Sequence, residues 1–259
     1  MHADAIIRYT LRETPKGTTS MYTFESVVRY SECDENSQLT IPALINYLQD
    51  ASTFHSEEIG HGVQHLKDHH FFWAITSWQI KISRLPSFCE PIRVSTWCYD
   101  VGAVSAQRNF MVETQDGERL VEADSMWVVF DTDKGRAVRI PASEMAFLTE
   151  DAPLDLPHVR RKLNPTGEGT TLEPIVVTKH HLDTNHHVNN GQYIQMSADV
   201  VATADPDFRF SRLLVQYRNQ AAEHDVIVPH LYREEDAYCI DLTNEDGTRY
   251  AICRMYGSH

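Results

Sequence analysis

The chain has 259 residues, of which 42% are hydrophobic and 23% charged, as in a globular protein with one large domain or two smaller ones. Its formal net charge of −14 would repel the phosphates of nucleic acids, so no nucleic-acid binding is expected. The apolar runs fall far short of the ~20 residues of a membrane helix, and Met1–Arg12 lacks the apolar stretch of a secretory signal. We therefore expect no membrane association.

The five cysteines are odd in number, widely spaced and without a C-x-x-C pair. This pattern disfavours a disulfide framework and a zinc knuckle, and it favours a reducing compartment. We predict a cytoplasmic protein.

In chain order, the first predicted elements are a strand at Tyr22–Tyr30 and a helix that Thr40 caps, with Pro42 in its first turn. Four β-rich segments follow, and Gln115-Asp116-Gly117 marks a hairpin turn between the last two. The apolar face of the helix comprises Ile41, Leu44, Ile45, Leu48 and Ala51. The β-rich segments are Phe71–Leu85, Ile92–Val101, Ser105–Thr114 and Arg119–Asp131.

A proline-rich stretch with little periodicity, Ile140–Glu173, indicates a linker. After it the same order of elements recurs, with a strand at Pro174–Thr178, a helix from about Asn190 and a final turn at Glu245-Asp246-Gly247. The later strands are expected at Leu213–Asn219, Asp225–Arg233, Ala237–Thr243 and Arg249–Tyr256. We therefore divide the chain into an N-terminal half at residues 1–140, a linker at 141–172 and a C-terminal half at 173–259.

A repeated motif before each helix supports two related halves. Asp34-x-Asn36-x-Gln38-Leu39 corresponds to Asp183-x-Asn185-x-His187-Val188, with each position recurring 149 residues later. The first half is longer between its helix and its last hairpin, and we place this insertion at His61–His70.

The second copy of the motif carries groups suited to hydrolysis. In an extended segment, alternation would direct Asp183, Asn185 and His187 to one side, just before the free N–H groups of a helix N-terminus. An activated water and a polarised carbonyl are what the cleavage of an acyl thioester needs, and it needs no covalent cofactor. The competing interpretation is turn and capping chemistry alone. We favour that for the first copy, since Gln38 cannot act as a base.

The run Leu182-Asp183-x-Asn185-x-His187-Val188-Asn189-Asn190-x-x-Tyr193 resembles the active-site signature of the acyl-acyl-carrier-protein (acyl-ACP) thioesterases of plants and bacteria. The similarity extends to a start near Tyr22, a tryptophan-bearing strand at Trp127–Asp131 and a strand at Val215–Gln220. The resemblance implies an α+β fold, a tandem double hotdog in which each half wraps an antiparallel sheet around a long helix. It also implies hydrolysis of a fatty acyl chain from the phosphopantetheine thiol of an acyl carrier protein.

The resemblance assigns Asp183, Asn185 and His187 to catalysis, and we assign Asn189, Asn190 and Tyr193 to substrate binding. One position departs from the family, which usually has a glutamate where this chain has Gln220. Glutamine can hold a water by hydrogen bonds but cannot take its proton, so we place Gln220 in the catalytic set without the role of base.

Two mechanisms remain open. In one, Asn185 and the helix N-terminus orient the carbonyl while His187, positioned by Asp183, activates water. In the other, Asp183 attacks as a nucleophile and forms an anhydride. Glu223 and Asp225 lie near enough in sequence to substitute for the family glutamate.

Two further clusters have simpler interpretations. His61, His65 and His69 recur at helical spacing, but no cysteine or paired carboxylate completes a site, so we expect a solvated face and no metal. The basic run Arg160-Arg161-Lys162 is either a solvated linker segment or a patch that docks an acidic carrier protein.

Two alternatives to a carrier-specific hydrolase stay open. The first is an acyl-CoA thioesterase with the same site, and the second is a non-catalytic acyl-binding protein, which Gln220 favours. We expect no cofactor and either a monomer or a homodimer, because a tandem double hotdog already mimics a two-subunit unit. The first half would receive the acyl chain, with Phe54, Phe71, Phe72, Trp73 and Trp78 as candidates, although most of these are expected to be core.

Overall fold

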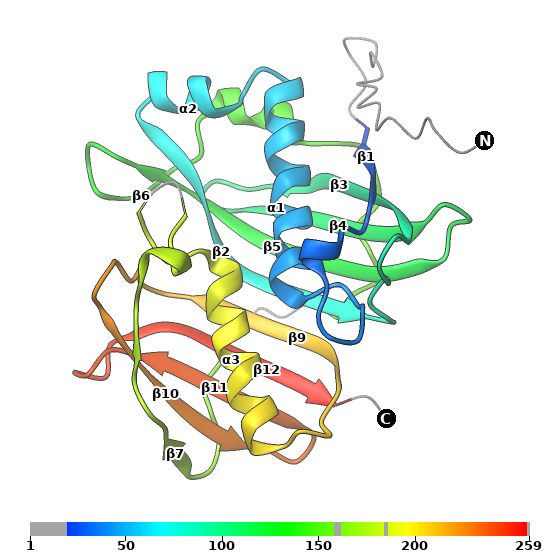
Figure 1. The fold of residues 1–259 in the computed structure, drawn as a ribbon. Helices are drawn as coiled ribbons and strands as arrows, with labels where there is room; N and C mark the ends of the chain where they lie inside the picture. Colours follow the sequence, from blue (N-terminus) through cyan, green and yellow to red (C-terminus); the bar gives the residue numbers. More distant parts are fainter. Residues whose placement is uncertain (1–19, 158–161, 184–185, 258–259) are drawn as a thin grey trace.

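The computed structural model describes residues 20–157, 162–183 and 186–257. Each half supplies an antiparallel set of strands and one long helix (Figure 1). The first half contains β1 (Tyr22–Val27), α1 (Ile41–Glu58), α2 (Val63–Asp68), β2 (Phe71–Ile82), β3 (Pro91–Val101), β4 (Ala106–Thr114), β5 (Arg119–Asp131) and β6 (Arg136–Val138). The second half contains β8 (Ile175–Val176), α3 (Asn190–Ala204), β9 (Phe210–Tyr217), β10 (Val226–Arg233), β11 (Ala237–Thr243) and β12 (Arg249–Gly257).

The strands form one continuous sheet in the order β1-β3-β4-β5-β2-β9-β12-β11-β10-β7, where β7 is Gly169–Thr171. Two short strands lie off this path, with β6 on β5 and β8 on β10. The halves join where β2 pairs with β9, from Ser77 opposite Gln216 to Lys81 opposite Arg212. This pairing satisfies the backbone of two strands that would otherwise be exposed sheet edges.

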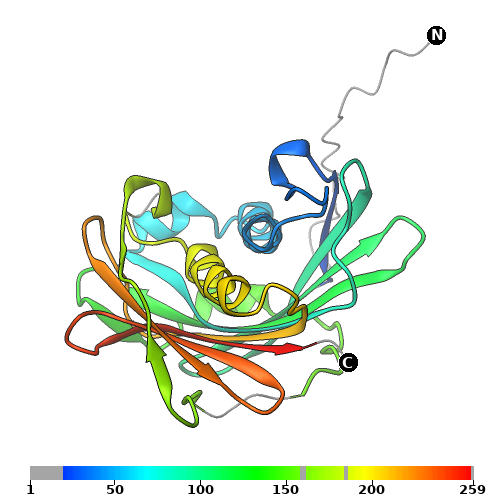
Figure 2. The same ribbon diagram turned by 60° about the horizontal axis from the view of Figure 1, so that its bottom comes forward.

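Both long helices lie on the same face of the sheet (Figure 2). A side-chain cap precedes the first turn of each helix, and the cap of α1 is the predicted one. The Thr40 hydroxyl accepts from the Ala43 N–H at 3.4 Å, and the Asn189 side chain accepts from the Gly191 N–H at 2.8 Å. The helices approach closely at Gly191, where an added Cβ would lie 3.5 Å from Ile45. The predicted apolar face of α1 is buried, each of its residues being 9% exposed or less.

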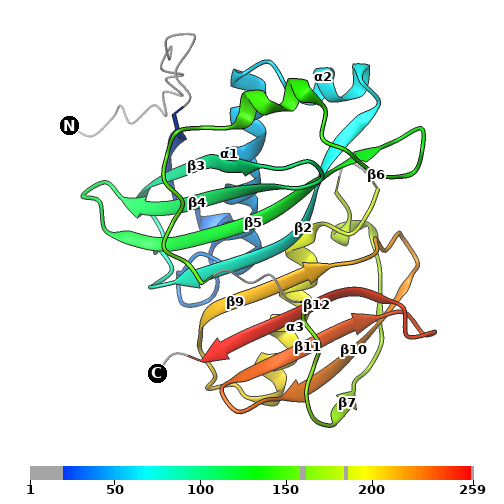
Figure 3. The ribbon, with the colours of Figure 1, turned by 180° about the vertical axis from the view of Figure 1, so that it is seen from behind.

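The opposite face of the sheet carries the connection between the halves (Figure 3). After the short 3-10 helix Ala142–Phe147, Leu148 bridges to Cys98, and the Trp97 indole donates to the Ala152 carbonyl at 3.0 Å. Further on, Leu163 packs in an apolar cluster on the second half. The segment predicted as a linker therefore packs along the sheet and also supplies β7. Of the basic run, Arg160 and Arg161 lie outside the described residues.

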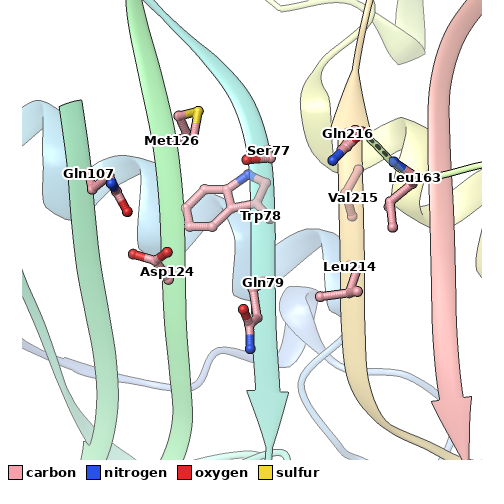
Figure 4. Close-up of a pocket in the computed structure, with 10 residues that line it drawn as sticks. All are labelled: Ser77, Trp78, Gln79, Gln107, Asp124, Met126, Leu163, Leu214, Val215 and Gln216. Atoms are coloured by element: carbon pink, nitrogen blue, oxygen red, sulfur yellow. Dashed lines mark hydrogen bonds between the residues drawn. The ribbon is translucent and has the colours of Figure 1, made fainter. Parts of the chain in front are cut away.

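A small cavity of about 30 Å³ lies at the junction of the halves (Figure 4). Its lining comes from β2, β4, β5, β9 and Leu163, whose N–H donates to the Gln216 side-chain oxygen at 2.9 Å. This volume accommodates about one water, so the cavity is too small for an acyl chain.

The predicted strands are confirmed in their order along the chain, with small differences at their ends. β1 stops at Val27, because Tyr30–Glu32 forms a 3-10 turn, and β8 spans only two residues. The predicted insertion contains the short helix α2, in agreement with the helical spacing of its histidines. Among the described residues, no helix combines the length and apolarity needed to cross a membrane.

Candidate active site

The segment before α3 is a closed loop and not the extended strand that we predicted. The Asp183 N–H donates to the His187 carbonyl at 2.8 Å, and the His187 N–H donates to the Asp183 carboxylate at 3.3 Å. His186 closes the turn with a φ of 62°. Loop closure, and not strand alternation, therefore brings Asp183 and His187 together. The third predicted catalytic residue, Asn185, lies outside the described residues.

The first half contains the same loop. Asp34 pairs with Gln38 through the same backbone hydrogen bond, its carboxylate accepts the Gln38 N–H at 2.9 Å, and Ser37 has a φ of 61°. The aspartate thus has a structural role in both copies, as the capping interpretation predicts. Where the first loop has the Gln38 amide, the second has the imidazole of His187.

The His187 side chain is half-buried. Among the described residues, the buried Nδ1 atom has no hydrogen-bond partner. The backbone of His187 pairs with Ala222, and the Val188 N–H donates to the Ala221 carbonyl at 2.9 Å. A buried imidazole nitrogen without a partner among the described residues is uncommon in folded proteins and marks His187 as a candidate functional group.

The same antiparallel pairing places Gln220 next to the segment that follows the Asp183–His187 loop. With His187 opposite Ala222 and Val188 bonded to Ala221, the next residues along the two segments are Asn189 and Gln220. The Gln220 side chain is exposed and lines the same groove as His187. The geometry therefore agrees with a role for Gln220 at the reacting end of a substrate.

Neither acidic residue beyond Gln220 takes its place. The Asp225 carboxylate accepts the Ala222 N–H at 2.8 Å and the Tyr250 hydroxyl at 3.4 Å, so it closes the loop. Glu223, like Asp225, is absent from the described residues that line the groove.

The predicted substrate-binding residues lie at the start of α3. Asn189 caps the helix, while the carbonyl of Asn190 accepts the Tyr217 hydroxyl at 3.0 Å. Tyr193 is 2% exposed, and its hydroxyl oxygen accepts the Ala221 N–H at 2.9 Å. Burial raises the pKa of both Tyr193 and Tyr217, so both phenols stay protonated at neutral pH.

One groove connects this site to the first half. Its volume is about 1680 Å³, and both Asp183 and His187 line it. Of the five aromatic candidates for the acyl-chain wall, three line the groove, namely Phe71, Phe72 and Trp73. Trp78 is instead core at 2% exposure, and Phe54 lies on the surface at 41%.

The first-half end of the groove contains a buried cation that the sequence did not indicate. Arg108 is 6% exposed, lines the groove and donates to His55 Nδ1 at 3.0 Å and to Thr96 at 3.2 Å. Burial, reinforced by this guanidinium, lowers the pKa of His55 to about 3, and burial lowers the pKa of Arg108 to about 10. The pair joins residues 53 positions apart, so no local pattern could have shown it.

The histidine stripe differs from the solvated face that we predicted. His61 and His65 are half-buried, and both contact the carboxylate of Glu144, from 83 and 79 residues away. The prediction failed because it considered only neighbours in sequence. These three are also the described residues whose ligand atoms lie close enough together to hold a metal ion.

Comparison with known proteins identifies the family. Residues 19–147 match the family model of the acyl-ACP thioesterase N-terminal domain, and residues 167–254 match that of the C-terminal domain. The chain belongs to the acyl-ACP thioesterase family. The predicted family is thus confirmed, while the boundaries at 140 and 173 stay predictions.

Curated relatives within the family are distant. The chain is 24% identical over 230 residues to the chloroplastic acyl-[acyl-carrier-protein] hydrolase FATB1 of Cuphea viscosissima, covering 82% of this chain and 53% of that protein. It is 23% identical over 224 residues to oleoyl-acyl carrier protein thioesterase 1 of Arabidopsis thaliana, covering 80% of this chain and 62% of that protein. The chain therefore spans little more than half the length of these relatives.

Solved structures of the family share the fold. An acyl-ACP thioesterase from Bacteroides thetaiotaomicron superimposes with a TM-score of 0.83 at 20% identity, over 92% of this chain and 98% of that one. The 12:0-ACP thioesterase from Umbellularia californica superimposes with a TM-score of 0.78 at 20% identity, over 92% of this chain and 97% of that one. The predicted α+β tandem double hotdog is confirmed.

Proposed function

We propose that this acyl-ACP thioesterase family member hydrolyses fatty acyl-ACP thioesters to the free fatty acid and the carrier thiol. The observation that carries the proposal is that His187 and Gln220, from two paired segments, line one groove that continues into the first half. The names of the relatives support acyl-ACP as the substrate. A cytoplasmic location, and a monomer or homodimer, stay predictions.

The proposed reaction uses water as the nucleophile. Gln220 holds the water, His187 takes its proton as the oxygen attacks the thioester carbonyl carbon, and a tetrahedral intermediate forms. When the C–S bond breaks, the imidazolium returns the proton to the leaving thiolate. No covalent intermediate and no cofactor are required.

The start of α3 supplies the donors for the developing oxyanion. The N–H groups of Gly191 and Gln192 are already bonded to Asn189. Among the described residues, the Asn190 N–H has no partner, so we place the oxyanion there, where the helix dipole favours negative charge. Asn185 would complete this role as the family resemblance implies. Tyr193 acts as a positioning residue, since its hydroxyl is bonded to Ala221.

The alternative nucleophile is the Asp183 carboxylate. A single turnover in ¹⁸O-labelled water tests for an anhydride that water opens at its aspartyl carbonyl. Attack by water places the label in the fatty acid alone, whereas hydrolysis of an anhydride at its aspartyl carbonyl would place label in Asp183. We expect an unlabelled Asp183 peptide by mass spectrometry.

Comparison of carrier-linked with CoA-linked thioesters tests the proposed substrate. We expect kcat/KM to be at least about tenfold higher for acyl-ACP than for the matching acyl-CoA, because only the carrier adds protein contacts to the same chemistry. A preference for acyl-CoA would instead support the first alternative. Binding of acyl-ACP with no turnover by folded protein would support the acyl-binding alternative.

A further inference from the structure

Three potential metal ligands converge outside the groove, on the segment that covers its first-half end. His61 lies two residues before the start of α2, His65 lies within α2, and Glu144 comes from the 3-10 helix Ala142–Phe147. The His61 Nδ1 and His65 Nε2 atoms lie 3.0 and 3.2 Å from the same oxygen of Glu144. All three ligand atoms lie within 4.8 Å of one another.

The carboxylate is oriented by a second set of contacts. The Trp73 indole donates to the other oxygen of Glu144 at 3.1 Å, and the Ser143 hydroxyl lies 3.0 Å from the first. The His65 ring also packs against the His69 ring, with centroids 4.2 Å apart. Ligands held by outer hydrogen bonds in this way are typical of metal centres.

The charge of Glu144 lacks a permanent counter-ion. Its side chain is fully buried, and the described residues offer it no lysine or arginine within ion-pair distance. A buried carboxylate is costly unless a cation neutralises it.

We propose that His61, His65 and Glu144 bind a divalent transition-metal ion of the Zn²⁺ class. Two imidazoles and one carboxylate are a ligand set that suits zinc, and a water would complete tetrahedral coordination. Binding requires only that each imidazole moves its proton to the other ring nitrogen, which frees His61 Nδ1 and His65 Nε2 as ligands. The hard cations Mg²⁺ and Ca²⁺ prefer oxygen ligands and do not fit this set.

The ion would join two segments that cover the groove. Leu66 of α2, Trp73 of β2 and Phe147 all line the groove and lie next to the ligands in sequence or in space. Fixing α2 to the 3-10 helix would therefore rigidify the first-half wall. This site is independent of the proposed hydrolysis, because the three ligands are not among the described groove-lining residues.

Titration of the full chain with Zn²⁺, and with Co²⁺ as a spectroscopic probe, tests the site. We expect one tightly bound Zn²⁺ per chain, a visible absorption band of tetrahedral Co²⁺ and an increase in Tm with Zn²⁺. His65→Gln keeps a donor for Glu144 but removes the imidazole, so it should lose at least about tenfold in Zn²⁺ affinity and lose the Co²⁺ band. His180→Gln is the matched control, since His180 is an exposed histidine beside the catalytic loop.

Metal binding at the histidine-rich catalytic loop is the competing outcome. Equal Zn²⁺ affinity in the wild type and His65→Gln, or no binding by either, would overturn the proposal. Far-UV circular dichroism of the metal-free variants checks their folding. If His65→Gln is unfolded, His61→Asn provides the same comparison.

Discussion

The Ala221 N–H donates a hydrogen bond to the Tyr193 hydroxyl oxygen over 2.9 Å. Both residues are buried, at 0% and 2% exposure, so the bond fastens α3 to the loop that carries Gln220. The Val188 N–H holds the same loop through the Ala221 carbonyl. The position of Gln220 relative to His187 therefore depends on a phenol that is itself sealed from solvent.

Tyr193→Phe should reduce both stability and activity. The substitution leaves the Ala221 N–H buried without an acceptor, which costs about 1–3 kcal/mol and lowers Tm by roughly 2–4 °C per kcal/mol. It should also lower kcat more than it raises KM, because Gln220 shifts while the groove is kept. Thermal unfolding and steady-state kinetics measure the two effects. Tyr250→Phe is the control, since the Tyr250 hydroxyl makes only a 3.4 Å contact with Asp225; an equal loss in both variants would contradict the assignment.

The side chain of Gln220 should determine kcat, because it can hold a water but cannot take its proton. Gln220→Ala removes a hydrogen bond to water, and we expect kcat to fall about tenfold, or ~1.4 kcal/mol in activation free energy. Gln220→Glu adds a carboxylate that can take a proton, and we expect kcat to rise about tenfold at neutral pH. Both variants are compared on one acyl-ACP substrate. A rate unaffected by either change would remove Gln220 from the site.

Asn189 and Asn190 are adjacent asparagines that we expect to differ in their contribution to stability. Asn189→Ala removes the side-chain cap of α3 and should lower the free energy of unfolding by about 1 kcal/mol. Asn190→Ala keeps the carbonyl that accepts from Tyr217 and should leave stability within roughly 0.5 kcal/mol of the wild type. Urea denaturation distinguishes them. Equal destabilisation by the two substitutions would show that the cap is not what stabilises the helix start.

His55 should make stability depend on pH. Its pKa falls from 6.5 in the free side chain to about 3 in the fold, so between these values the unfolded chain binds a proton that the folded chain does not. Acidification therefore favours unfolding through this residue, by up to about 1.4 kcal/mol per pH unit, and the effect is absent above the ordinary pKa. His55→Gln keeps an acceptor for Arg108 and cannot titrate.

Urea denaturation at about pH 7 and about pH 5 measures this effect. The wild type should lose more stability between the two values than His55→Gln does, whereas the exposed His180→Gln should behave like the wild type. Parallel losses in all three proteins would mean that His55 is protonated in the folded chain.

Local signals were sufficient to predict most of the fold. Thr40 caps α1 as predicted, and the predicted Asp-Gly turns place Gly117 and Gly247 at φ values of 87° and 80°. The repeat of the Asp-x-Asn motif is also a structural repeat, since Asp34 and Asp183 close equivalent loops. Capping and turn formation depend on a few adjacent residues, so sequence spacing describes them well.

Contacts between distant segments were not predictable in the same way. The loop closure between Asp183 and His187 requires a left-handed residue at His186, where the sequence suggested simple alternation. Glu144 contacts His61 across 83 residues, and Arg108 contacts His55 across 53. These pairs follow from how α1, α2 and the 3-10 helix pack over the sheet. Hydrophobic periodicity within a single segment does not encode such packing.

The role of His187 is the central claim, and its substitution tests it most directly. Hydrolysis of a carrier-linked fatty acyl thioester is measured with wild type, His187→Ala and the neighbouring control His180→Ala, after the folding of each has been checked. General-base catalysis contributes roughly 10²–10⁴-fold, so His187→Ala should lose at least about a hundredfold in kcat while His180→Ala keeps wild-type activity. A folded His187→Ala protein that turns over acyl-ACP at the wild-type rate would contradict the account.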